Sequence, residues 1–177
     1  RNSVRADLVV QLVGTGTGGT CGFGLVPPNG TDSGNLKYYT FSVSAVRNGN
    51  GTACPANVVA HEMGHNFSLG HDRDQGLSNT FFPYGVGHKV DSSYGTTMSY
   101  PGLGFNGYLP FLSNPDISIS GVPLGVPVGQ STQAHAAQAV ANVSSYYEGI
   151  LSNGSVDLSP LAPILESYTS TPSSIRL

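Results

Sequence analysis

The segment HEMGHNFSLGHD, at residues 61–72, constrains this chain more than any other feature. On a helix with about 3.6 residues per turn, His61 and His65 lie one turn apart on the same face, and Glu62 lies beside that face. His71 would point about 240° away if the helix continued unbroken. We therefore expect the helix to end soon after His65 and the chain to double back, so that all three imidazoles meet.

These residues predict a catalytic zinc site. Three neutral imidazoles, from His61, His65 and His71, leave one position of a tetrahedral zinc ion open, whereas protein ligands fill every position of a structural zinc site. Glu62 would lie within reach of a water molecule at the metal and could take its proton as a general base. Two histidines can also fall at this spacing by chance on an amphipathic helix, but the third histidine makes that explanation much weaker.

A methionine-containing turn, GTTMSY at residues 95–100, follows the histidine segment. Together the two segments resemble the metzincin signature, H-E-x-x-H-x-x-G-x-x-H followed by a Met-turn. The pair His71-Asp72 is similar to the adamalysin (reprolysin) branch of that family. Further stretches resemble bacterial peptidyl-Asp metalloendopeptidase-like relatives of this branch: residues 6–10, 21–24, 97–100 and 112–115.

The resemblance implies roles for three further side chains. Met98 would form a soft apolar floor beneath the imidazoles without binding the metal. Tyr100 would lie near the metal and stabilise the oxyanion; the alternative is a tyrosine packed in the wall with its hydroxyl hydrogen-bonded. Asp72 would be buried and would support the Met-turn.

The resemblance also implies where a substrate binds. The edge strand of the sheet would hold an extended polypeptide through its backbone donors and acceptors. This strand comprises Gly22, Phe23, Gly24 and Leu25. Residues 101–115 are rich in apolar side chains and carry no charge, so we expect an apolar pocket for the substrate residue just after the scissile bond.

The implied fold is α+β and metzincin-like, with a twisted mixed sheet and the active-site helix above an irregular C-terminal subdomain that one helix closes. Hydrophobic periodicity predicts helices from about Pro55 to Ser68 and over residues 131–147. It also predicts strands, of which residues 6–13 would be buried on both faces and residues 38–46, with alternating polarity, on one face. A third short strand is expected at residues 21–26.

Residues 1–149 would form the catalytic domain, which we expect to lack the N-terminal strand and helix of the family. Residues 150–177 change to a composition rich in Ser, Pro, Thr and Leu, which is typical of a linker or C-terminal extension.

Ser68 is the one departure from the signature, because it replaces the glycine that lets the helix end in a sharp turn. A left-handed backbone conformation costs a residue other than glycine about 1–2 kcal/mol. Two alternatives follow: either Ser68 carries this strain, or the turn shifts to Gly70, which has no such cost. Either would let His71 swing back.

The two cysteines, Cys21 and Cys54, would pair in a disulfide if the protein is secreted, as the family resemblance and the low charge content imply. The alternative is two buried free thiols in a cytosolic protein. The two cysteines lack the C-x-x-C spacing of a second zinc site. We therefore expect a disulfide and a secreted, extracellular enzyme.

Charge and hydropathy argue against two classes of partner. A net charge of −3 provides no basic face for nucleic acid. The apolar runs, such as residues 8–13, are far too short to span a membrane. The sequence does not indicate an oligomeric state.

A calcium ion could be held by three carboxylates, because calcium prefers clustered oxygen ligands. The candidates are Asp72, Asp74 and Asp91. No loop with calcium-binding spacing is present, so solvated or salt-bridged carboxylates are the better interpretation.

We therefore expect a zinc-dependent endopeptidase, a hydrolase that cleaves peptide bonds of extended protein substrates by Glu62-assisted attack of water. The alternative is a non-catalytic zinc-binding or protein-interaction module on the same scaffold. Ser68 is the only local feature that favours the alternative.

Overall fold

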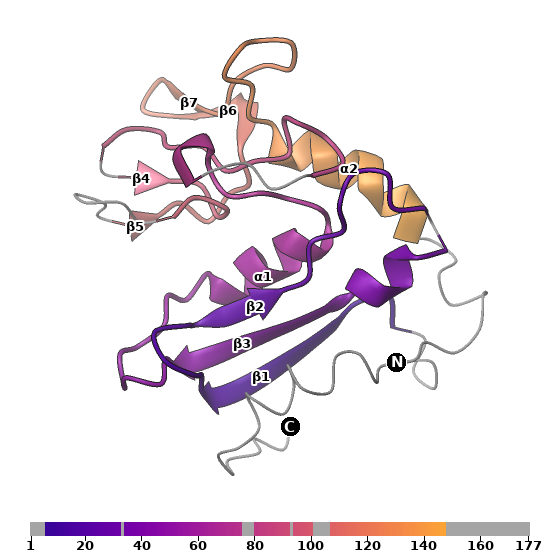
Figure 1. Ribbon diagram of the computed structural model, residues 1–177. Helices are drawn as coiled ribbons and strands as arrows, with labels where there is room; N and C mark the ends of the chain where they lie inside the picture. The colour runs from indigo at the N-terminus through magenta and orange to yellow at the C-terminus, as the bar shows by residue number, and fades with distance from the viewer. Residues whose placement is uncertain (1–5, 33, 76–79, 93, 101–106, 148–177) are drawn as a thin grey trace. The chain divides into compact units, whose positions relative to one another are not determined.

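The computed structural model describes residues 6–32, 34–75, 80–92, 94–100 and 107–147, which belong to two units of the chain. The first unit comprises residues 1–25, 32–66 and 146–177, and the second comprises residues 26–31 and 67–145. Each unit has its own secondary structure (Figure 1). The predicted extension over residues 150–177 lies outside the described residues.

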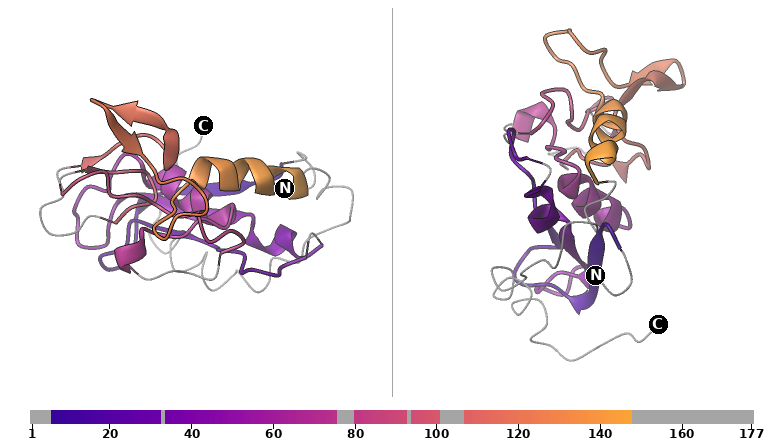
Figure 2. Two further views of the ribbon diagram at one scale, coloured as in Figure 1. Left: turned by 90° about the horizontal axis from the view of Figure 1, so that it is seen from above. Right: turned by 90° about the vertical axis from the view of Figure 1, so that its right-hand side faces the viewer.

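The first unit contains a three-stranded mixed sheet in the order β1-β3-β2. β1 (Val9–Thr15) runs parallel to β3 (Phe41–Arg47), and β2 (Gly22–Gly24) runs antiparallel to it. A short 3-10 helix, η2 (Leu36–Tyr39), precedes β3. Helix α1 (Val58–Asn66) packs along β2 and β3 (Figure 2).

Small side chains form the face of the sheet that α1 covers. Gly22 pairs with Ser44 and Gly24 pairs with Ser42, and paired residues lie on the same face of a sheet. A Cβ atom at either glycine would collide with α1. The helix can therefore approach this face closely only because these two residues have no side chain. The opposite face carries Val43, with Val13 and Ala45 packed beside it.

Two of the predicted strand environments are wrong. β1 is an edge strand of the described sheet, and its Leu12 side chain is 58% exposed, so it is not buried on both faces. The central strand β3 is instead buried on both faces from Phe41 to Ala45. Both errors arise because the polarity of a sequence reveals neither the order of the strands nor what covers a polar face. Ser42 and Ser44 face a helix rather than water.

The second unit contains mostly irregular chain with short elements. η3 (Arg73–Gln75) is a 3-10 turn; β4 (Tyr94–Gly95) pairs in parallel with β5 (Gly107–Tyr108); β6 (Asn114–Ile119) and β7 (Val122–Leu124) form an antiparallel hairpin. Helix α2 (Ala136–Tyr147) closes the C-terminal part of the described chain, as predicted.

The core of the second unit gathers around fully buried side chains of Leu69, Met98 and Ala136, with Ala139 packed beside them. The mixed sheet, the histidine-bearing helix and the C-terminal helix confirm the predicted α+β fold. Among the residues that the structure describes, no helix is long and apolar enough to cross a membrane.

Candidate zinc site

Helix α1 presents two of the three predicted ligands on one face. His61 and His65 are one turn apart, and their rings lie 4.8 Å apart between centroids in an edge-to-face arrangement. His65 is buried, whereas His61 is half-buried. The helix therefore supplies a pair of imidazoles in the geometry that the sequence spacing predicts.

The chain leaves α1 through a left-handed residue. α1 ends at Asn66, and Ser68 adopts φ 59°. Gly70 does not have a positive φ; it lies in an extended bridge with Val86. Of the two alternatives for this turn, the structure supports the one in which Ser68 carries the strain, at a cost of about 1–2 kcal/mol.

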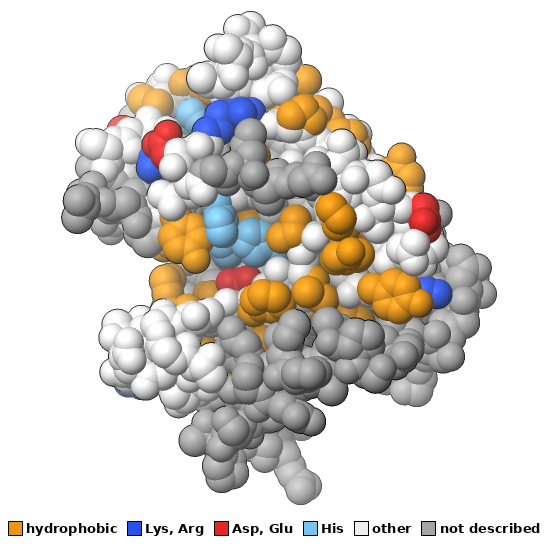
Figure 3. Space-filling model, in the orientation of Figure 1, with side chains coloured by type: hydrophobic (Ala, Val, Ile, Leu, Met, Phe, Trp, Pro, Cys, Tyr) orange, Lys and Arg blue, Asp and Glu red, His pale blue; other side chains and the backbone are white. Residues whose placement is uncertain are grey.

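The reversed chain brings the third histidine to the other two. One nitrogen from each of His61, His65 and His71 lies within 4.8 Å of the others. All three donors are imidazole nitrogens, which suit zinc, and three protein ligands leave a position for substrate or water. The three predicted zinc ligands therefore have nitrogens close enough to share one ion. Histidine side chains reach the surface of the molecule (Figure 3).

Glu62 is 7% exposed and lies against strand β2. Burial raises the pKa of its carboxyl to about 8, and a hydrogen bond from the Gly24 backbone opposes that rise. A zinc ion bound at the neighbouring histidines would favour the charged form of this carboxyl through its own positive charge. A buried carboxyl whose pKa is shifted toward neutrality is suited to exchanging protons with a reactant.

Strand β2 makes room for this carboxyl because Gly22 has no side chain. A Cβ atom there would lie 2.5 Å from both Cγ and Oε1 of Glu62. At Gly24, a Cβ atom would meet the backbone of Glu62 and come within 2.8 Å of the His65 Cβ. These two glycines thus define the space that Glu62 and the helix occupy.

Asn66 is a structural anchor that sequence analysis missed. Its side chain is fully buried, and Nδ2 donates hydrogen bonds to the carbonyls of Leu25, at 3.1 Å, and Phe41, at 2.9 Å. The hydroxyl of Tyr147 donates to the Asn66 carbonyl. The end of α1 is thereby tied to the residue after β2, to the start of β3 and to Tyr147. The sequence offered one signal for this role, namely that Asn66 directly follows the predicted zinc ligand His65.

The Met-turn region of the second unit is held by Asp72. This carboxylate is 2% exposed, and its Oδ2 accepts a hydrogen bond from the Tyr100 backbone N–H at 2.8 Å. Met98, two residues before Tyr100, is fully buried. Asp72 thus has the position and the partner that the family resemblance implies.

Tyr100 lies beside the third histidine. Its ring contacts that of His71 edge-to-face, with 4.4 Å between centroids, and the residue is 46% exposed. Tyr108, which lies in the stretch expected to line an apolar pocket, is the second tyrosine of this region. Burial raises the pKa of its hydroxyl to about 12, and the charges of Tyr100 and Asp72 add to the shift. The interaction between Tyr100 and Tyr108 has no sequence signature.

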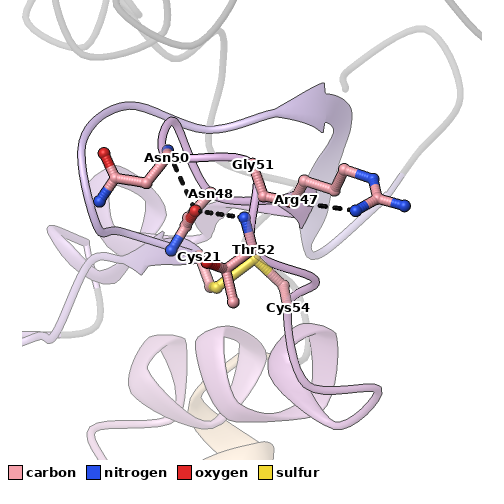
Figure 4. The surroundings of a disulfide bond; sticks show 7 residues. All are labelled: Cys21, Arg47, Asn48, Asn50, Gly51, Thr52 and Cys54. Carbon is pink, nitrogen blue, oxygen red and sulfur yellow. Dashed lines mark hydrogen bonds between the residues drawn. A yellow bond between two sulfur atoms is a disulfide. The ribbon is translucent and has the colours of Figure 1, made fainter.

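The predicted disulfide between Cys21 and Cys54 is present, with 5.5 Å between Cα atoms (Figure 4). It joins the start of β2 to the segment that follows β3. The adjacent turn is held by Asn48, whose side-chain oxygen accepts hydrogen bonds from the Asn50 and Thr52 backbone N–H groups. The disulfide therefore fixes the strand that carries the two site glycines.

An ammonium group occupies the place considered for calcium. Lys89 Nζ lies 2.9 Å from Asp74 Oδ2 and 3.6 Å from Asp72 Oδ1. Asp91 instead accepts a hydrogen bond from the Tyr94 backbone N–H. The carboxylates considered for calcium thus serve as salt-bridged and turn-forming groups.

Comparisons with known proteins point in the same direction. Residues 1–72 match the family described as metallo-peptidase family M12B, reprolysin-like. A peptidyl-Asp metalloendopeptidase of Pseudomonas aeruginosa is 27% identical over 160 residues, which cover 82% of this chain and 26% of the relative. One from Xanthomonas campestris is 34% identical over 87 residues, which cover 49% of this chain and 21% of the relative. The chain thus spans about a quarter of the length of these relatives. No solved structure gives a significant match.

Proposed function

We propose that this chain, whose residues 1–72 match the reprolysin-like M12B metallopeptidases, is a zinc-dependent endopeptidase acting on extended polypeptides. The observation that carries the proposal is the gathering of three imidazole nitrogens within 4.8 Å, with the buried carboxyl of Glu62 on the helix that carries His61 and His65. Residues 1–149 would be the part of the protein that performs the reaction. Zinc bound at the imidazoles would supply Lewis acidity, polarising the scissile carbonyl and acidifying a water molecule.

Glu62 is the proposed general base and acid. Its carboxylate takes a proton from the attacking water and later delivers it to the departing amine. Its buried position against β2 keeps it next to His61, one residue before it on α1. Tyr100 is the proposed donor to the oxyanion, because its ring contacts that of His71 and the residue remains partly exposed. Met98 would contribute only an apolar packing surface.

Substrate binding is proposed at β2. This strand lies at the edge of the described sheet, so one of its sides is not paired with β3. An extended peptide can add to such an edge through main-chain hydrogen bonds. Gly22 to Leu25 would provide those donors and acceptors. The proposed apolar pocket falls partly on residues 101–106, which lie outside the described residues.

Secretion is proposed on the strength of the disulfide between Cys21 and Cys54, since such bonds persist in oxidising compartments. Western blotting of culture medium and cell lysate from the source organism would test this. Protein found only in the lysate would contradict it.

The catalytic proposal is tested by replacing the base and a ligand separately. Glu62→Ala should retain zinc but lose at least about 10³-fold in casein cleavage, since water then lacks a proton acceptor. His65→Ala should lose both zinc and cleavage. His135→Ala is the matched control, because His135 lies directly before α2 and is not in the zinc cluster. Cleavage by Glu62→Ala at the unaltered rate would rule out this role for Glu62.

A further inference from the structure

Ser68 combines a strained backbone conformation with two hydrogen bonds of its buried hydroxyl. Among the described residues, only Ser68 and Ser120 adopt a positive φ without being glycine, at 59° and 52°. Ser68 is 2% exposed, whereas Ser120 is exposed in the turn between β6 and β7. A buried residue keeps such a conformation only when the surrounding structure fixes it.

The Ser68 hydroxyl makes two buried hydrogen bonds, one as donor and one as acceptor. It donates to the Pro27 carbonyl at 2.7 Å and accepts from the Phe81 backbone N–H at 2.8 Å. These partners are 41 and 13 residues away in sequence. One oxygen therefore links the turn after α1 to two other segments of the second unit. Glycine at this position could make neither bond.

Ser68, which makes these two hydrogen bonds, lies three residues before the proposed third zinc ligand, His71. Leu69, the next residue, is fully buried in the core of the second unit beside Met98. Gly70 then forms backbone hydrogen bonds with Gly85 and Gly87, at 2.9 and 3.2 Å. The path from Ser68 to His71 is thus anchored at each step, and Ser68 fixes where that path begins.

We propose that Ser68 is a positioning residue for the imidazole of His71. Its two hydrogen bonds fix the backbone at a turn where a glycine would leave the chain free to move. The proposal rests on the proposed zinc function. Pre-organised ligands release a metal slowly, because the chain cannot swing one imidazole away without breaking the anchor. The alternative is that serine is merely tolerated where glycine would serve better.

Ser68→Gly separates these two explanations. Glycine relieves the left-handed strain but leaves the Pro27 carbonyl and the Phe81 N–H without their partner. If Ser68 is an anchor, Ser68→Gly should release zinc about tenfold faster than the unmodified protein, as judged by transfer to a chelating dye. If serine is merely tolerated, Ser68→Gly should hold zinc as well or better.

Two further variants complete the experiment. Ser68→Ala keeps the strain and loses both bonds, so it should release zinc at least as fast as Ser68→Gly. Ser120→Gly is the matched control, because it relieves a similar φ at an exposed turn; its zinc release should be unchanged. Thermal unfolding of each zinc-free protein would show whether any variant fails to fold, and Ser68→Gly has the smaller risk because it removes strain.

Zinc release is measured together with kcat and KM for a peptide substrate. We expect Ser68→Gly to lower kcat with little change in KM, because the anchor acts through His71 and not on the substrate. Unmodified protein that binds no zinc would overturn the zinc site and this proposal together. Unmodified protein that binds zinc and cleaves, while Ser68→Gly does both equally well, would overturn only the role of Ser68.

Discussion

Replacing Gly22 by alanine should displace the proposed base without unfolding the protein. The added Cβ would lie 2.5 Å from Cγ and Oε1 of Glu62 and 2.7 Å from its Cδ. Carbon atoms in contact are normally about 3.5–4.0 Å apart, so the carboxyl end of Glu62 must move by about 1 Å. These atoms belong to a flexible side chain, which can move while the backbones of β2 and α1 stay in place.

The magnitude follows from the sensitivity of proton transfer to geometry. A displacement of about 1 Å at a reacting group can cost about 10²-fold in rate. We therefore expect Gly22→Ala to lower kcat for a fluorogenic peptide about 100-fold. Zinc content should stay at the unmodified level, since the three atoms nearest to the added Cβ all belong to Glu62 and not to a zinc ligand.

Two companion variants make the assay specific. Gly19→Ala is the control, because a Cβ there has its nearest neighbour 4.0 Å away and the backbone φ is not positive; its kcat should be unchanged. Gly24→Ala should instead destabilise the fold, because its Cβ would meet the backbone of α1, which cannot yield as a side chain does. Full activity in a folded Gly22→Ala protein would refute the placement of Glu62 against β2.

Three further predictions concern the scaffold. Cys21→Ala should lower the free energy of unfolding by roughly 3–4 kcal/mol, because the disulfide closes a loop with a sequence separation of 33; equal urea midpoints with and without the bond would contradict this. Asn66→Ala should cost about 2–4 kcal/mol in urea unfolding, since two buried carbonyls lose their donor; a cost below 1 kcal/mol would argue against the anchor. Asp72→Ala leaves the Tyr100 N–H without its acceptor and should lower kcat more than Asp72→Asn, which keeps an acceptor oxygen; equal kcat values would contradict that role.

Local spacing allowed the zinc ligands to be predicted, because two of them depend only on the helical repeat. His61 and His65 are one turn apart on α1 whatever the rest of the chain does. The disulfide and the α+β architecture followed from the resemblance. These features reside in short motifs, which is why they could be predicted without the structure.

Features that depend on contacts distant in sequence could not be predicted. Asn66 bonds to carbonyls 41 and 25 residues away, and Ser68 bonds to Pro27 across 41 residues. The alternation of polarity in β3 predicted that one face of the strand would be exposed to solvent. Instead, α1 covers Ser42 and Ser44, because the glycines of β2 let the helix approach. Pattern alone does not show which element covers a polar face.

The proposed zinc peptidase activity is best tested by measuring zinc content and proteolysis on the same purified protein. We predict one zinc ion per chain, cleavage of casein that stops when a chelator removes the metal, and recovery of cleavage when zinc is returned. Cleavage that continues in metal-free protein would contradict the proposed activity, as would a protein that binds no zinc.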